Sequence, residues 1–478
     1  RKSQRTAKGG PKLAVTLGPL QVDIANSEPV SPATGSVASS QPHFSVAAIG
    51  KELRMASDFD VVPGTAPSKC PIAAATYDPM DPEHLANPDA VFRTLAEDNP
   101  VQFIPALQMY FVLTEDLCRE VLRDTDTYTS RLANNPGEVP DEVKPRLPEG
   151  YPHSFPGLIN NDPPAHDEHR YYIKRLFTPK TVLQYQPIME ALTTELIDGF
   201  ISDGHVDFVG QFAVPLPIRV ITTILGAHDL DIDTVRRWTE SAFGLVDPNL
   251  EHSVRVGMAN DIADLNDYAQ ALIDSRRASP TDDLMSTLVH LKTDEGEYAY
   301  NDPELRHHFL ILLGAGNATT TTLLGNLVFH LLRDRTNWER FVADRSLADS
   351  AIEETLRIKA PAKIAFRNAT RDVELSGVSI PQGAFVCPAL TQANMSDEKW
   401  PNPTEFQIDR PNAREHYAFG KFAHFCLGAP VSRLEAKLVL NKLADRLPGL
   451  RLAKDFIPQY RPHILTQDLL ELPLEWDL

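Results

Sequence analysis

A single cysteine is placed where a metal-binding thiolate can form. Cys426 closes the segment Ala418-Phe-Gly-Lys-Phe-Ala-His-Phe-Cys426, and apolar residues recur at helical spacing after Pro430. This pattern puts Cys426 just before the N-terminus of a helix, where the helix dipole and free N–H groups stabilise a negative charge. Gly428 lets the backbone approach a flat cofactor, since no side chain intervenes, and His424 can donate to an acidic group on that cofactor. A buried inert cysteine is the simpler alternative.

Two pairs of residues have spacings that suit charge pairing. Glu354 and Arg357 lie three residues apart on one face of a predicted helix. A surface ion pair is the simple reading, and such a pair contributes little to stability. His166 and Arg170 lie four residues apart, which suits them to hold an anionic group together. The alternative for each of these two residues is a solvated charge or a satisfied core histidine.

A long predicted helix over residues 305–332 carries an unusual segment, Leu313-Gly-Ala-Gly-Asn-Ala-Thr-Thr-Thr-Thr322. Glycine and threonine inside a helix lower its propensity, so another interaction should compensate. Close packing, with threonine hydroxyls bonded to the carbonyls of the helix itself, is one explanation. A functional groove in the helix is the other.

Together these motifs resemble the cytochrome P450 family, in its soluble bacterial form. The match to the family's heme-binding signature consists of Phe419, Gly420, His424, Cys426 and Gly428, continued by Ala429-Pro430 and Arg433-Leu-Glu-Ala436. The resemblance covers nearly all of the sequence from about Cys70 onward. It implies that the cofactor is heme b and that Cys426 is the axial ligand of its iron.

The resemblance also implies roles for the other motifs. Glu354, Arg357 and Arg410 correspond to a buried trio that holds the segment leading to the cysteine. Ala315 and Gly316 correspond to a groove that admits dioxygen, and Thr319 to the hydroxyl that assists its activation. The residues expected to meet the two heme propionates are His166, Arg170, Arg367 and His424.

Two positions depart from the family pattern. Ala318 stands where the family normally has Asp or Glu just before the threonine, so we expect protons to pass through Thr319, Asn317 and water, or through a group of the substrate. This departure keeps open a peroxide-driven oxidation and a non-oxidative isomerisation or dehydration. Phe422 stands where the family usually has a second glycine, which predicts a reshaped bulge before the cysteine.

The composition suits a large enzyme that works in a reducing compartment. The 478 residues are 42% hydrophobic and carry a net charge of -19, which argues against nucleic acid as a partner. No apolar run approaches the roughly 18 residues that a transmembrane helix needs. The cysteines show no paired spacing of the kind found in disulfide frameworks or zinc sites, so we expect a cytoplasmic protein. They are Cys70, Cys118, Cys387 and Cys426.

The predicted fold is mainly α with small β-sheets (α+β), as in the cytochrome P450 fold, with one large helical heme domain over residues 76–478 and a smaller β-rich part. Helical spacing marks 91–98, 115–123, 187–203 and 216–225, and strands are predicted at 110–113, 373–375 and 385–386. Residues 131–161 are predicted to form a long functional loop. Residues 1–75 are rich in Ser, Pro, Ala and Gly, so we expect a largely disordered tail. Its basic start also fits an organelle-targeting segment, although a flexible tail is the simpler reading.

By resemblance, we expect a monooxygenase that inserts one oxygen atom from O2 into a small, mostly apolar organic substrate. Its pocket would be lined from residues 131–160, 234–272, 312–319, 362–366 and 464–467. We expect Lys363 to point to solvent rather than into this pocket, because lysine is rarely buried unpaired. A non-catalytic heme-binding protein is a further alternative.

The sequence contains no flavin- or iron–sulfur-binding segment after the cysteine motif, so we expect a separate ferredoxin or flavodoxin-type electron donor. Basic residues in segments flanking Cys426 are the predicted docking site for an acidic donor. Ordinary surface charge explains them equally well. These residues are Lys174, Arg175, Lys421, Arg433 and Lys437.

Overall fold

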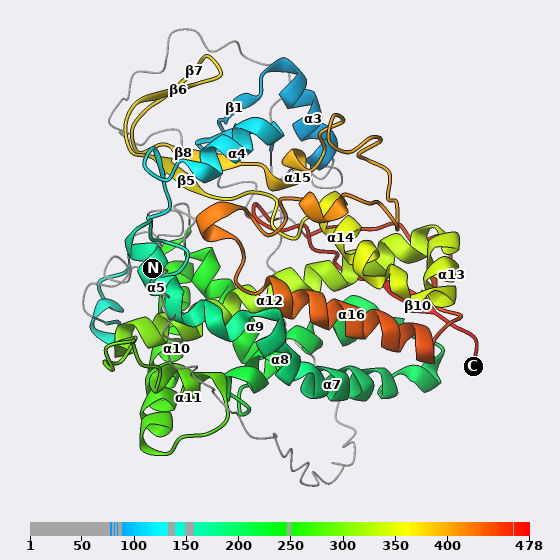
Figure 1. Cartoon of the computed structure of the whole chain (residues 1–478), viewed down its shortest axis with the longest axis horizontal. Coiled ribbons are helices and arrows are strands. Elements are labelled where there is room, and N and C mark those ends of the chain that lie inside the picture. The colour runs from blue at the N-terminus through cyan, green and yellow to red at the C-terminus, as the bar shows by residue number, and fades with distance from the viewer. Residues whose placement is uncertain are drawn as a thin grey trace, which may run out of the picture.

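The computed structural model describes residues 77–78, 81, 84, 88–131, 139–148, 157–245, 250–461 and 463–478. Helices form most of the molecule, and the main sheet gathers at one end of the helical body (Figure 1). The structure confirms the predicted mainly helical fold with small sheets. The expected tail, residues 1–75, lies outside the described residues.

The largest sheet has five strands in the order β1-β2-β8-β5-β3. Its strands β2 and β8 run parallel, with Tyr110 opposite Val386, and its other pairs are antiparallel. The helices α3, α4 and α15 lie beside this sheet (Figure 1). Its strands are β1 (Val101–Ile104), β2 (Met109–Val112), β3 (Tyr128–Thr129), β5 (Arg367–Ala369) and β8 (Phe385–Pro388).

Two smaller sheets complete the β structure of the described residues. One has the order β4-β10-β9 and joins the C-terminal strand to the middle of the chain; the other is the hairpin β6-β7. Their strands are β4 (His205–Asp207), β9 (Arg451–Leu452), β10 (Pro473–Glu475), β6 (Val373–Leu375) and β7 (Val378–Ile380).

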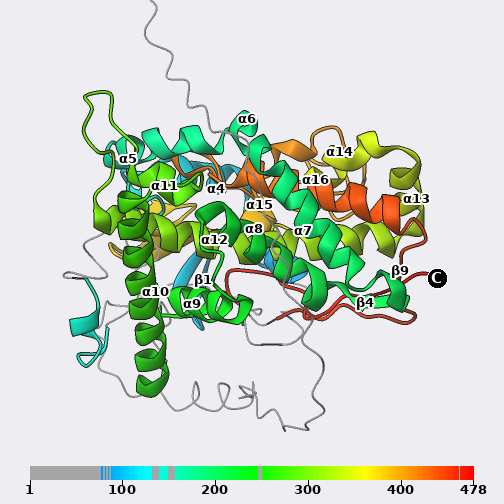
Figure 2. The ribbon, with the colours of Figure 1, turned by 90° about the horizontal axis from the view of Figure 1, so that it is seen from below.

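The helical body is built around α12 (Asp302–Arg333), which contacts α8, α9, α10, α14 and α16. The other α-helices are α3 (Pro88–Asp98), α4 (Glu115–Arg123), α5 (Ala165–Ile173), α6 (Pro179–Val182), α7 (Gln186–Asp198), α8 (Pro215–Leu225), α9 (Ile232–Gly244), α10 (His252–Ala278), α11 (Leu284–Val289), α13 (Arg335–Ala343), α14 (Ala348–Ile358), α15 (Leu390–Ala393) and α16 (Ala429–Arg446). The long α10 runs across the direction of α16 (Figure 2).

Short helical turns connect these elements. They are η1 (Lys144–Arg146), η2 (Lys174–Phe177), η3 (Leu183–Tyr185), η4 (Ile201–Asp203), η6 (Arg345–Leu347), η7 (Ala413–Glu415), η8 (Phe422–His424) and the π-helical turn η5 (Val209–Ala213).

The sequence explains why α12 is long and central. Asn301 and Glu304 form a capping box, in which each side chain accepts a hydrogen bond from the backbone N–H of the other residue. From Thr322 to Leu332 every residue of the helix is buried, and most of these residues are apolar, so this part of α12 packs on all sides. Although α12 is 32 residues long, neither it nor any other described helix is apolar enough over its length to cross a lipid bilayer.

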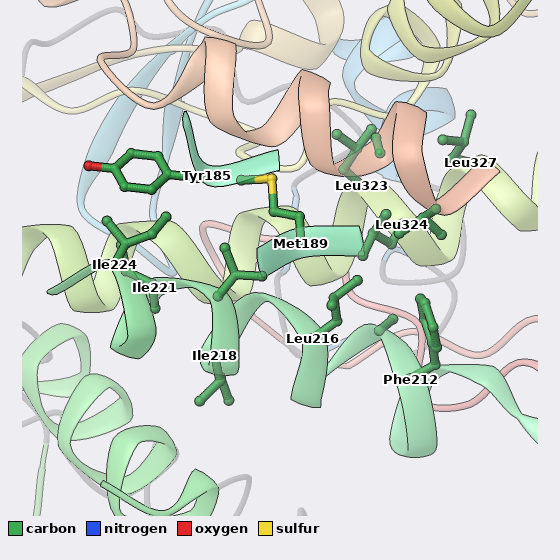
Figure 3. Packing of buried hydrophobic residues seen from close by; sticks show 14 of the residues in the cluster. Tyr185, Met189, Phe212, Leu216, Ile218, Ile221, Ile224, Leu323, Leu324 and Leu327 are labelled. Carbon is green, nitrogen blue, oxygen red and sulfur yellow. The ribbon is translucent and has the colours of Figure 1, made fainter. Parts of the chain in front are cut away.

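The main core joins α7, α8 and α12. Figure 3 shows Met189, Ile221 and Leu323, one from each of these helices, within the same packed cluster. Burying one such aliphatic side chain contributes about 1.5–3 kcal/mol. The packing fixes the position of α12, and hence of the segment around Thr319.

Most predicted elements match the structure closely. The prediction for 115–123 coincides with α4, and the predicted helix 305–332 lies within α12. The predicted helix 187–203 is wrong at its end, because α7 stops at Asp198 and the separate turn η4 follows Gly199. Within the predicted loop 131–161, the described residues include η1, while 132–138 and 149–156 lie outside the described residues.

Candidate functional site

Cys426 lies just before α16, in the position that the sequence predicts. Its backbone N–H donates to the Phe419 carbonyl over 2.8 Å, which closes the bulge that precedes it. Burial raises the pKa of the Cys426 thiol, while the backbone N–H groups of Gly428 and Ala429 and the nearby guanidinium of Arg170 lower it. The protein therefore supplies hydrogen-bond donors and a positive charge that favour a thiolate, against the cost of burying it.

Cys426 and two alanines of α12 are accessible to solvent although they lie within the helical body. Protein surrounds Cys426 deeply on all sides, and yet the residue is exposed. On α12, which contacts α16, Ala315 and Ala318 are also exposed, although Leu313 and Thr320 beside them are buried. Exposed alanines in the middle of a buried helix indicate an internal space beside that helix.

The four side chains predicted to meet the propionates, His166, Arg170, Arg367 and His424, lie near one another. The rings of His166 (from α5) and His424 lie 4.3 Å apart between centroids, and the Ser130 hydroxyl is 3.2 Å from His424 Nε2. Burial, together with Arg367 and His166, lowers the pKa of His424 to about 3. The nearby carboxylate of Asp162 already accepts from Thr129 and from the Ser130 N–H.

Unpaired nitrogens in this cluster show where an anion would fit. Among the described residues, neither Nε of the buried Arg367 nor Nε2 of the buried His166 has a hydrogen-bond partner. The Arg367 Nε–H is a buried donor, which is costly unless it is paired. His166 Nε2 donates only when the ring is doubly protonated, because Nδ1 already faces the Asp167 carboxylate at 3.0 Å. A carboxylate of a heme would satisfy the Arg367 donor, so these residues fit the predicted cofactor. Arg170 already has a hydrogen-bond partner, because its guanidinium donates to the Phe425 carbonyl beside the cysteine.

The predicted trio of Glu354, Arg357 and Arg410 is fully assembled and buried. The Glu354 carboxylate accepts from Arg357 at 2.7 and 2.8 Å and from Arg410 at 2.9 Å. Arg357 also donates to the carbonyls of Asn394 and Pro403. Removing one member of a buried, fully bonded ion pair typically costs 3–5 kcal/mol. The trio therefore ties α14 to the segment that leads to Cys426.

A second charged trio, which the sequence reasoning missed, lies one residue away. Glu353 accepts from Arg433 at 2.6 and 2.8 Å and contacts His416 at 3.0 Å. Burial raises the pKa of Glu353, but His416 and Arg433 outweigh it and bring the pKa to about 2. The Arg433 guanidinium also lies 4.5 Å above the Phe419 ring. In the sequence, the only indication of this second trio is that Glu353 directly precedes Glu354.

Phe422 keeps the backbone conformation that a glycine would favour. Its φ is +57°, close to the +64° of Gly420. A non-glycine residue in this left-handed region costs about 1–2 kcal/mol. Its ring is 41% exposed and lies under the guanidinium of Arg123. The departure from the family pattern is thus accommodated by strain at this residue.

The threonine segment of α12 presents two different faces. The Thr319 hydroxyl donates to the Ala315 carbonyl over 2.9 Å, and Ala315, Ala318 and Thr319 lie on the face that is at least partly exposed. Asn317 is buried, and its amide donates to the Leu313 carbonyl. A Cβ on Gly316 would lie 3.4 Å from Ile221 of α8, which is an ordinary van der Waals contact. The structure therefore brings Thr319 and Ala318 together and sets Asn317 apart from them.

Lys363 does not point to solvent, so that prediction is wrong. The side chain is only 2% exposed, and its Nζ donates to the His463 carbonyl over 2.6 Å. Burial lowers its pKa to about 8, while Asp89 and Asp468 act in the opposite direction. These neighbouring acids and the carbonyl replace the solvent that the sequence reasoning assumed.

Glu435, on α16, is a further buried acid. It is 2% exposed, and among the described residues its Oε1 has no hydrogen-bond partner. Burial raises its pKa to about 8. The motif that contains it was noted in the sequence, but its burial was not predicted.

Known proteins are similar to this chain in sequence and in fold. Residues 252–446 match the family model Cytochrome P450. Cytochrome P450 107B1 of Saccharopolyspora erythraea is 34% identical over 353 residues, which span 72% of this chain and 84% of that protein. Steroid C26-monooxygenase of Mycobacterium tuberculosis (strain H37Rv) is 35% identical over 67% of this chain and 80% of its own length. The crystal structure of CYP109E1 from Bacillus megaterium in complex with testosterone is 30% identical, has a TM-score of 0.72, and covers 83% of this chain and 100% of its own.

Proposed function

Because this chain belongs to the cytochrome P450 family, and is thus a heme-binding monooxygenase, we propose that Cys426 ligates the iron of heme b and that the substrate is a small, mostly apolar organic molecule. When bound, a thiolate-ligated heme supplies the activation of O2, with two electrons, and the insertion of one oxygen atom into the substrate. The remaining roles belong to side chains of the protein.

His166, Arg367 and His424 hold the propionates in this proposal. The unpartnered Nε–H of Arg367 carries the argument, since a buried donor without an acceptor calls for an anion. Arg170 contributes positive charge near Cys426 while it holds the Phe425 carbonyl. Phe419 and Gly428 flank the thiolate, and the Arg433 guanidinium keeps the Phe419 ring in place.

Thr319 is the proposed hydroxyl for proton delivery. Its present bond to the Ala315 carbonyl uses its only proton, and a rotation of the side chain redirects that proton into the internal space beside α12. Ala318 offers no carboxylate beside it. Asn317 supports this turn of the helix from its buried face, because its amide already bonds to the Leu313 carbonyl.

The decisive experiment is the spectrum of the reduced protein under carbon monoxide. Wild type should give the absorption of a thiolate-ligated heme, and Cys426→His should lose it. Cys118→Ala provides the control, since this buried cysteine bonds to the Val112 carbonyl beside the main sheet. Thiolate-type absorption that survives Cys426→His would overturn the assignment.

A peroxide-driven or non-oxidative reaction is the second candidate, and Ala318 is the observation that favours it. Turnover that requires an electron donor and O2 supports the monooxygenase. Turnover with peroxide alone, or with neither, supports the alternative. The first substrates to test are steroids, because one relative is named a steroid monooxygenase and one similar structure holds testosterone.

An acidic ferredoxin or flavodoxin-type protein is the proposed electron donor. The structure narrows the predicted docking residues, because Arg433 is engaged with Glu353, and Lys421 donates to the Glu415 carbonyl. Lys174 and Arg175 are exposed around the Tyr171 ring, and Lys437 pairs with Asp349 on the surface.

Charge reversal at Lys174 and Arg175 tests this site. It should slow reduction at low salt and weaken the salt dependence of the rate. The matched control is charge reversal at the exposed pair Arg236 and Arg237 on α9. Unchanged reduction rates at all salt concentrations would refute the docking site.

A further inference from the structure

The C-terminal segment 463–470 places a carboxylate against α12. The Thr322 hydroxyl is within hydrogen-bond distance of Asp468 Oδ1 and lies 2.9 Å from the Ala318 carbonyl. The other oxygen of the carboxylate, Oδ2, accepts from the Thr466 hydroxyl over 2.9 Å. Thr322 and Thr466 are buried, whereas Asp468 is partly exposed. The carboxylate therefore connects solvent with a hydroxyl inside the protein.

The position of this hydroxyl on α12 is significant. Thr322 follows Thr319 by three residues and Ala318 by four, and residues at these spacings are neighbours on one helix surface. Asp468 thus reaches the helical turn next to the one where a carboxylate is missing at Ala318. Asp468 comes from a segment far away in the sequence, so no motif around Thr319 predicts its contact with α12.

The hydrogen bonds of Thr322 allow a proton to be shared. A threonine hydroxyl has one proton, but here it has two acceptors, the Ala318 carbonyl and Asp468 Oδ1. When the hydroxyl donates to the carbonyl, a protonated Asp468 can donate to Thr322 Oγ1. When Asp468 is ionised, the hydroxyl turns toward it. The contact therefore serves both protonation states of the carboxyl group.

The surrounding groups keep the site polar without blocking it. Nδ1 of His463 accepts the N–H groups of Leu465 and Thr466, at 3.2 and 3.1 Å. The ammonium of Lys363 is held by the His463 carbonyl and lies near enough for Asp468 to raise the pKa of the lysine. Among the described residues, the two carboxylate oxygens of Asp468 are hydrogen-bonded to the hydroxyls of Thr322 and Thr466.

We propose that Asp468 is the relay carboxylate of this enzyme, passing protons through Thr322 and water to Thr319 in place of the acid missing at position 318. The proposal rests on the monooxygenase function proposed above. A proton leaves Asp468 Oδ1 for Thr322 Oγ1 as the proton of Thr322 passes to a water on the Thr319 side. Asp468 is left ionised and regains a proton from bulk solvent through its exposed side, so no electrons move in this step.

The test compares Asp468→Asn and Thr322→Val with wild type in the heme-loaded enzyme. Both variants should keep heme content and the thiolate-type reduced carbon monoxide spectrum, because neither touches Cys426. The fraction of reductant that ends in product should fall about 100-fold, at the low end of acid–base contributions, and hydrogen peroxide should rise. Ala318→Asp should restore coupling in the Asp468→Asn background.

The control variant is Thr321→Val. Thr321 is the next residue, but its hydroxyl donates to the Ala213 carbonyl of η5, on another side of α12. Its coupling should equal that of wild type. The proposal would be overturned if Asp468→Asn and Thr322→Val kept their coupling, or if Thr321→Val lost it equally. Glu435→Gln removes the other buried acid described above. A loss of coupling in that variant alone would also overturn the proposal.

A readout that does not depend on turnover completes the test. A crystal structure of the heme-loaded protein should show ordered water between Thr322 and Thr319, and the same water should be displaced or lost in Asp468→Asn. A dry, closed contact between these two threonines would contradict the relay. Loss of the thiolate spectrum in wild type itself would instead reject the underlying function.

Discussion

The backbone of Phe422 is left-handed beneath the guanidinium of Arg123, whose central carbon lies 5.3 Å from the centre of the ring. Two opposing effects meet at this residue. The conformation is strained for any residue with a Cβ, while the stacked cation stabilises the ring by about 0.5–1 kcal/mol at an exposed site.

Comparing Phe422→Gly with Phe422→Ala isolates the backbone strain. Both variants lose the ring, but only Ala retains a Cβ at φ +57°. We expect the glycine variant to be more stable by about 1 kcal/mol in urea unfolding. The same two substitutions at Phe425, where φ is -51°, should give the opposite order. A glycine variant at 422 that is less stable than the alanine variant would show that the strain is absent.

Charge reversal should destabilise the protein much more at Arg433 than at Lys437. Arg433→Glu places a second carboxylate against the buried Glu353, so we expect a loss of about 3 kcal/mol or more in the free energy of unfolding. Lys437→Glu disrupts only an exposed pair with Asp349 and should cost less than about 1 kcal/mol. Equal effects in chemical denaturation would mean that Glu353 is not held by Arg433.

Glu435 should make the protein less stable as the pH rises. Its pKa is about 8 in the folded state and near 4.5 when unfolded, so the unfolded state loses its proton first. Stability is then complete below pH 4.5 and falls between pH 4.5 and 8, by up to about 1.4 kcal/mol per pH unit. Glu435→Gln should flatten the unfolding free energy over this range and raise it at pH 7. A variant with the wild-type slope would contradict the prediction.

His330 should act in the opposite direction at acidic pH. It is 4% exposed on α12, and burial, together with nearby cations, lowers its pKa to about 3. The unfolded chain therefore binds this proton first, and stability falls as the pH drops from 6.5 toward 3. Replacement by leucine should remove about 1.4 kcal/mol per pH unit from the slope between pH 6 and 4. The measurement is urea unfolding of both proteins across this range.

The sequence alone predicted the features that depend on local pattern. The position of Cys426 before a helix, the helix around Thr319 and the mainly helical fold follow from spacing and from family motifs. Features that depend on contacts between residues far apart in the sequence could not be predicted from local pattern. The burial of Lys363 requires the His463 carbonyl, and the bond between Thr322 and Asp468 joins residues 146 positions apart. The end of α7 was missed because the apolar pattern continues past Gly199 into a separate turn.

The two adjacent acids of α14 bind different parts of the chain. Glu354 is hydrogen-bonded to Arg410, while Glu353 is hydrogen-bonded to His416 and to Arg433 in the first turns of α16. A helix turns by about 100° per residue, so inserting one residue earlier in α14 would swing both carboxylates away from their partners at once. This helix should therefore tolerate exchanges of its apolar side chains far better than any change in its length.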